Sequence, residues 1–130
     1  MNKSFNLNSE KIEAHFLSKP EHWQGILFNV RDFILHSHKQ MQEFYKYKTP
    51  FFGIEKNICY MNLRADQSAL DIGFVQGRSL EETHPVISPF LEGKNLKSIR
   101  HVKIKIDEWP EKMDNLNQVL ILAIDYCLIS

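Results

Sequence analysis

Apolar residues recur every three or four positions over the first third of the chain, which is the spacing of one face of a helix. Ile12 and Phe16 lie on the same face of a short first helix, which Pro20 prevents from continuing. A second helix is expected to follow and to end near His36. Its apolar positions are Trp23, Ile26, Leu27, Val30, Phe33 and Ile34. The amino-terminal part of the chain therefore predicts two amphipathic helices.

The period changes to two after Glu43, which is typical of strands with one buried face. Tyr45–Lys48 and Phe52–Glu55 are expected to be short strands. Pro50 lies between them and cannot donate to a strand ladder, so it is expected at an edge, bulge or turn. This segment predicts the first part of an antiparallel sheet.

Two further alternating segments predict a hairpin with a defined register. Ala65–Ser68 carries turn residues and separates the two segments. The expected cross-strand pairs are Leu63 with Leu70, Met61 with Ile72, Cys59 with Phe74, Tyr60 with Gly73, and Asn62 with Asp71. A slip of one residue would place apolar side chains opposite polar ones, so the pattern specifies this pairing strongly.

A loop-rich middle and one more strand complete the pattern. Val86–Leu91 is expected to form one or two helical turns, and residues 100–106 alternate as a last strand with Val102, Ile104 and Ile106 inward. A terminal helix with Pro110 in its first turn has its body from Leu116 to Ile129. The prediction is a single α+β domain over residues 1–130, with an antiparallel β-sheet and two N-terminal helices and a C-terminal helix packed on one face.

Composition narrows the class of protein. With 43% hydrophobic and 12% aromatic residues, the 130-residue chain can bury a core, which excludes wholesale disorder. Lys plus Arg and Asp plus Glu both number 16, so no net field attracts a polyanion, and no nucleic-acid partner is expected. The longest apolar run is about half of what a bilayer span needs, and the first residues lack the apolar core of a signal peptide. We expect a cytoplasmic protein without a membrane partner, whose two cysteines are thiols.

Several short segments together resemble a known family. They are Lys46-Tyr-Lys-Thr-Pro-Phe-Phe52, Ile58-Cys-Tyr-Met61, Leu70-Asp-Ile-Gly-Phe74, Leu91-Glu-Gly-Lys94 and Ile99-Arg-His-Val-Lys-Ile-Lys105. In this order they resemble the YdhG-like family, a domain of unknown function, and the likeness runs from about the first helix to the end of the chain. The resemblance implies helices packed on an antiparallel sheet. Some members are described as frataxin-like iron chaperones, so it also implies iron as a cofactor or cargo. The family commonly has Gly where this chain has Lys48.

An iron site would need hard oxygen ligands, often several carboxylates on one face. Glu81, Glu82 and His84 form the candidate metal site, because a loop at this position could fold these ligands inward. A solvated turn is the alternative interpretation. The acidic residues Asp107, Glu111 and Asp114 share a face of the terminal helix. Acidic residues are common at the start of a helix, however, because they stabilise the positive end of the helix dipole.

The outward face of the expected sheet gathers basic and aromatic residues. The candidate ligand-binding residues are Lys46, Tyr47, Tyr60, Arg64, His101 and Lys103. Such a face could hold a small anion or stack on a ring. The alternative interpretation is a solvated face whose lysines protect the sheet from aggregation.

The sequence contains no Gly-x-Ser-x-Gly, phosphate-loop, His-Glu-x-x-His or dinucleotide-binding motif, so no enzymatic activity is expected. The function predicted is a non-catalytic binding or carrier module that handles iron, with the binding of a small anionic ligand on the basic and aromatic sheet face as the alternative.

The terminal helix is apolar on nearly every side from Val119 to Ile129, so each of these sides is expected to be covered. Either the first two helices enclose it, or a homodimer forms through Leu122, Tyr126 or Ile129.

Overall fold

The computed structural model describes residues 7–129, which form four α-helices, one 3₁₀ helix and five strands. The helices are α1 (Leu7–Leu17), α2 (Glu21–Leu35), α3 (Gly77–Thr83), η2 (Pro85–Phe90) and α4 (Trp109–Ile129). The strands are β1 (Gln42–Lys46), β2 (Thr49–Ile54), β3 (Lys56–Leu63), β4 (Leu70–Phe74) and β5 (Arg100–Ile104). Both amino-terminal helices and the terminal helix are where the apolar spacing predicts them.

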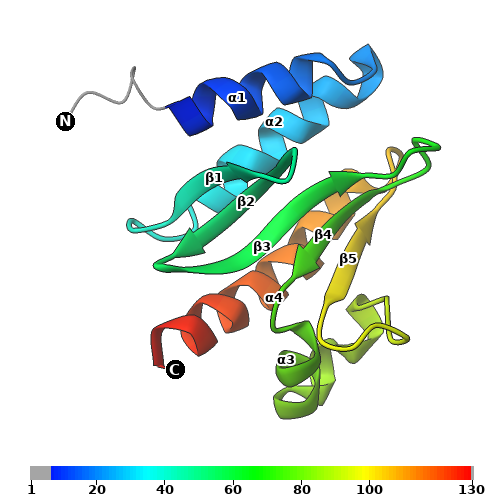
Figure 1. The fold of residues 1–130 in the computed structure, drawn as a ribbon. Helices are drawn as coiled ribbons and strands as arrows, with labels where there is room; N and C mark the ends of the chain where they lie inside the picture. Colours follow the sequence, from blue (N-terminus) through cyan, green and yellow to red (C-terminus); the bar gives the residue numbers. More distant parts are fainter. Residues whose placement is uncertain (1–6, 130) are drawn as a thin grey trace.

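The strands form one antiparallel sheet in the order β1-β2-β3-β4-β5, so each strand pairs with its neighbour in the sequence. In Figure 1, α2 lies behind the amino-terminal half of the sheet and α4 behind the other half, whereas α3 lies at one end of the strands. The α+β class is confirmed. Because the helices of residues 7–129 gather on one side, none of them covers the other face of the sheet.

The β3–β4 hairpin has the register that its alternation predicts. Met61 lies opposite Ile72, Leu63 opposite Leu70, and Tyr60 opposite Gly73. Met61, Leu70 and Ile72 are at most 2% exposed because all three face the helices. Burial of this one face fixes the pairing, since a one-residue slip would turn every apolar side chain to the solvent.

The core fills the space between the sheet and the helices. Phe52, Ile72 and Val102 contribute from three strands, and Trp23 and Leu120 from α2 and α4. The largest side chains of this core are at most 2% exposed. A charged pair is buried at its edge, where the Arg31 guanidinium donates to both carboxylate oxygens of Glu43 at 2.7 and 2.6 Å.

The structure differs from the sequence-based prediction in three local features. Tyr47 and Lys48 are not strand residues: they form the β1–β2 turn with φ of 52° and 56°. Residues 77–83 form a short helix where a loop was expected, so Glu81 and Glu82 lie on α3. The last strand ends at Ile104, and Ile106 is 39% exposed instead of facing inward.

Within residues 7–129, the terminal helix α4 has a buried side and an exposed side. Leu116, Val119, Leu120, Ala123 and Ile124 are buried, and the helix contacts the sheet, α3 and η2. Ile121, Leu128 and Ile129 are exposed, so the first two helices do not enclose this helix. Within residues 7–129, none of the helices combines the length and the apolar character that crossing a bilayer requires.

Candidate functional site

The helix-free face of the sheet carries a row of aromatic side chains that crosses the strands. Phe44 of β1 lies opposite Phe51 of β2, and Phe51 lies opposite Tyr60 of β3. Tyr60 lies opposite Gly73 of β4, which in turn lies opposite His101 of β5. Alternation places these residues on the side away from the core, because their sequence neighbours Phe52, Cys59, Met61 and Val102 are buried. We call Phe44, Phe51, Tyr60 and His101 the aromatic row.

Tyr60 is the centre of the aromatic row. Its ring centroid lies 5.4 Å from that of Phe51 and 6.5 Å from that of His101. The ring extends over Gly73, where an added Cβ would lie 2.2 Å from Tyr60 Cζ. The Tyr60 hydroxyl reaches to 3.4 Å from His101 Nε2. Partial burial and, secondarily, the charge of Asp71 raise the pKa of Tyr60, so the phenol stays protonated at neutral pH.

Lys46 and Lys103 place cations at the two ends of this face. Lys46 Nζ lies 5.3 Å from the Phe44 ring centroid and 3.4 Å from Asn57 Oδ1, so this side chain lies along the aromatic row. Lys103 of β5 lies opposite Asp71 of β4 and is two residues from His101, hence on the same face of the sheet. Among residues 7–129, no carboxylate forms a salt bridge with either lysine.

Arg64 differs from these lysines because it is already paired. Its guanidinium donates to both Asp71 oxygens at 2.8 and 3.0 Å and lies 3.9 Å from Glu92. The hydrogen bond with Asp71 is the main reason why the pKa of Arg64 is raised. A ligand would therefore meet Arg64 and Asp71 as one neutral pair, with a second acid, Glu92, beside it.

The predicted ligand-binding residues converge on this face. Lys46, Tyr60, Arg64, His101 and Lys103 all project from its strands or strand ends. Tyr47 is 89% exposed in the β1–β2 turn, with its ring centroid 6.4 Å from that of Phe51.

Phe44 and Phe51 are parts of the face that the sequence interpretation missed. The signal for Phe51 was the Phe51-Phe52 pair, since adjacent strand residues point to opposite faces and only one of them can enter the core. Phe44 alternates in the same way with Glu43 and Tyr45.

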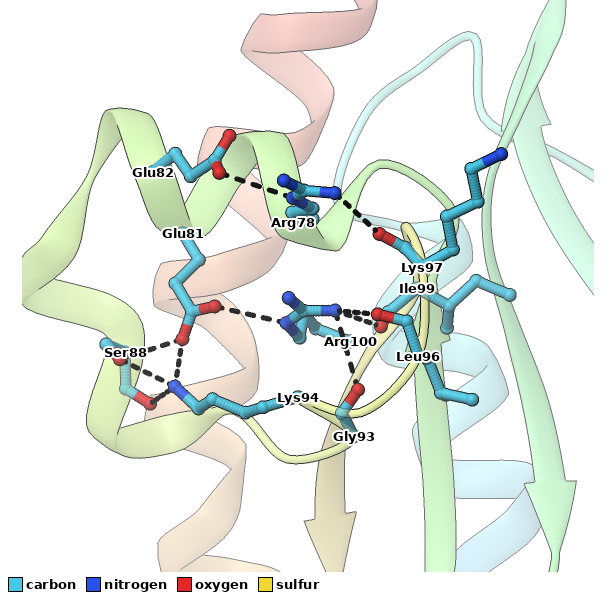
Figure 2. Close-up of polar contacts among 10 residues, drawn as sticks. All are labelled: Arg78, Glu81, Glu82, Ser88, Gly93, Lys94, Leu96, Lys97, Ile99 and Arg100. Carbon is cyan, nitrogen blue, oxygen red and sulfur yellow. Dashed lines mark hydrogen bonds and ion pairs between the residues drawn. The ribbon is translucent and has the colours of Figure 1, made fainter.

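The predicted metal residues lie elsewhere, around α3. Glu81 accepts hydrogen bonds from Ser88 Oγ at 2.8 Å and from Arg100 Nε at 3.1 Å, and its carboxylate also pairs with Lys94. Figure 2 shows Glu81 between these three partners, whereas Glu82 turns to Arg78 at 3.3 Å. The hydrogen bond from Lys94 is the first of several causes that lower the pKa of Glu81 to about 2.

The Glu81 cluster anchors the loop that precedes β5. Arg100 is buried, and its Nη1 donates to the carbonyl oxygens of Leu96 and Ile99 at 3.0 and 2.9 Å. His84 lies just after α3, and its backbone N–H donates to Leu80. Residues 7–129 contain no group of three His, Cys, Asp or Glu side chains arranged to hold a metal ion. Glu81 acts here as the acceptor for two cations.

A comparison with solved structures identifies the architecture. The chain matches the crystal structure of a DUF1801 family protein, YdhG of Bacillus subtilis, over 82% of its own length and 87% of that protein, with a TM-score of 0.55. The chain has a YdhG-like fold. Sequence identity over the match is 13%, so the likeness concerns the fold. The YdhG-like arrangement agrees with the resemblance seen in the short sequence segments, although no family model matches the chain. No curated protein matches it either.

Proposed function

We propose that this YdhG-like domain is a binding module whose helix-free sheet face takes a small ligand with a planar ring and an anionic group. The observation that supports this most is the aromatic row, in which Tyr60 lies over Gly73 between Phe51 and His101. Rings stack on such a surface with a gain of about 1 kcal/mol per aromatic pair beyond burial. Lys46 and Lys103 supply the charge for an anionic substituent.

Iron is the competing ligand, because the family resemblance suggests iron handling. Its candidate residues Glu81 and Glu82 are engaged by Arg100, Lys94 and Arg78. A metal ion would have to displace these cations before it could reach the carboxylates. The contacts of the two sites therefore favour the sheet face over α3 as the place of ligand binding.

Titration with 2-naphthoate, followed through backbone amide chemical shifts, tests the proposal. Saturable shifts are expected at Phe51, Tyr60 and His101, and they should be weaker with the uncharged 2-naphthamide. Lys103→Gln should reduce the affinity for naphthoate by about tenfold, the loss of one charge-assisted hydrogen bond. Lys11→Gln, on the exposed side of α1, is the matched control and should bind like the unaltered protein.

Two results would overturn the proposal. One is a naphthoate titration without saturable shifts on the sheet face. The other is anaerobic calorimetry in which Fe(II) binds saturably and the Glu81→Gln, Glu82→Gln double variant loses that binding, while naphthoate gives no heat. The second result would establish the iron-handling alternative in its place.

A further inference from the structure

A second concave site lies on the opposite side of the sheet from the aromatic row. It is a pocket of about 260 Å³ between the start of β3, α3 and the last turns of α4. Its apolar wall includes Ile58, Leu80, Ala123 and Tyr126. None of these four residues belongs to the aromatic row or takes part in the side-chain hydrogen bonds of Glu81.

An irregularity in the sheet helps to form this pocket. Phe52 pairs with Cys59 but Gly53 pairs with Asn57, so Ile58 is an extra residue on β3. A bulge of this kind redirects a side chain. Ile58 is 5% exposed and lines the pocket together with Ala123 of α4.

The charged and amide groups of the pocket belong to exposed residues, and the Tyr126 hydroxyl and the Cys127 thiol belong to half-buried ones. Lys56, Asn57 and Gln76 are exposed, whereas Leu80 and Ala123 are buried. Lys56 is the only charged residue that lines the pocket, and no salt bridge within residues 7–129 engages it. An apolar interior with one cation and two amides at its rim suits a molecule with an apolar body and one negative end.

We propose that this pocket binds a small amphipathic monocarboxylate, with its apolar body against Leu80 and Tyr126 and its carboxylate at Lys56. The volume is below the roughly 300–1,000 Å³ of pockets for drug-sized ligands, so a ligand of about ten non-hydrogen atoms fits. Gln76 offers an amide N–H group for the second carboxylate oxygen, whereas Asn57 Oδ1 accepts from Lys46 Nζ at 3.4 Å.

Cys127 provides a reporter for occupancy. It lines the pocket and is half-buried, whereas Cys59 is fully buried and burial raises the pKa of its thiol. Iodoacetamide is therefore expected to alkylate Cys127 first, as intact mass and peptide mapping would show. Saturating 4-phenylbutyrate should slow this alkylation at least fivefold. The uncharged 4-phenylbutanamide should protect Cys127 only at about tenfold higher concentration, because it lacks the charge-assisted bond to Lys56.

Variants on the two sides of the sheet separate this site from the aromatic row. Lys56→Gln should weaken protection by phenylbutyrate about tenfold and leave naphthoate binding to the aromatic row unchanged. Lys103→Gln should leave protection unchanged. The inference fails if acid and amide protect Cys127 equally, if Lys56→Gln has no effect, or if amide shifts with phenylbutyrate map to Tyr60 and His101 instead of Ile58 and Ala123.

Discussion

The ring of Tyr60 occupies the space that a side chain at Gly73 would need, since an added Cβ would lie 2.2 Å from Cζ and 2.5 Å from the hydroxyl oxygen. The two residues are directly opposed on β3 and β4. Glycine at this position is what lets the ring extend over β4 toward His101. The orientation of the aromatic row therefore depends on a residue that contributes no side chain to it.

Gly73→Ala is expected to lower the free energy of unfolding by about 1–3 kcal/mol, the usual cost of overpacking. The new methyl group would push the Tyr60 ring away from β4, so the ring-proton shifts of Tyr60 and Phe51 should change and naphthoate affinity should fall. Urea denaturation and NMR measure the two effects. Gly25→Ala is the control, because an added Cβ at Gly25 would meet no atom within 4 Å apart from its chain neighbours and the backbone of its own helix. It lies on the exposed side of α2, where alanine should stabilise by about 0.5–1 kcal/mol.

Lys48→Gly should stabilise the protein, because Lys48 has a φ of 56° in the β1–β2 turn. The left-handed conformation costs a side-chain-bearing residue about 1–2 kcal/mol, and glycine loses about 0.5–1 kcal/mol more in conformational entropy on folding. The expected net gain is about 0.5–1 kcal/mol in the free energy of unfolding, measured by urea denaturation. Lys46→Gly, in the adjoining strand, should instead destabilise. Equal effects of the two variants would contradict this account of the turn.

The same turn explains why the sequence did not predict Phe44 and Phe51 as parts of the aromatic row. The β3–β4 hairpin was predictable because three apolar pairs on one face specify its register. The β1–β2 hairpin turns at Tyr47-Lys48, which lacks the Asn-Gly or Asp-Gly signature of such turns. Without a recognisable turn, the register that places Phe44 opposite Phe51 could not be read from the sequence.

The helix α3 was missed for a different physical reason. It has seven residues, begins at Gly77 and buries one large apolar side chain, Leu80, so it shows no helical period. Its contacts are tertiary: Glu81 on this helix forms salt bridges with Arg100 of β5 and with Lys94 of the loop that precedes β5. These partners are 13 and 19 positions away in the sequence, beyond the reach of local patterns.

Those partners make Glu81 a determinant of acid stability. Its pKa is lowered from 4.5 to about 2 in the folded protein, so the folded state binds fewer protons than the unfolded state over that interval. The stabilising contribution is therefore complete above about pH 4.5 and is lost as the pH falls toward 2. Glu81→Gln should cost about 2 kcal/mol at pH 7, since it leaves buried Arg100 without its carboxylate.

Denaturation with urea at several pH values checks this assignment. The difference between Glu81→Gln and the unaltered protein should shrink steadily between pH 5 and pH 2. Glu82→Gln is the matched control, because Glu82 forms an exposed pair with Arg78 and should change stability by less than about 0.5 kcal/mol. A difference that stays constant over this pH range would show that the Glu81 charge does not stabilise the fold.

The outer side of α4 bears on self-association. Ile121 and Leu128 are 55% and 49% exposed and lie seven residues apart, hence on the same side of the helix. Leu122 and Tyr126 beside them are half-buried. An apolar surface of this kind is covered by a second copy more readily than by water.

We expect a homodimer at micromolar concentration, so light scattering should give a mass near twice the 15.3 kDa of the chain. Ile121→Glu should reduce the mass to that of the monomer. The variant should lose only the thermal stability that dimer formation provides, because Ile121 is outside the core. Gln40→Glu adds the same charge on an exposed loop and should leave the dimer intact. A mass of 15.3 kDa that persists on concentration would show instead that the exposed side of α4 stays in contact with solvent.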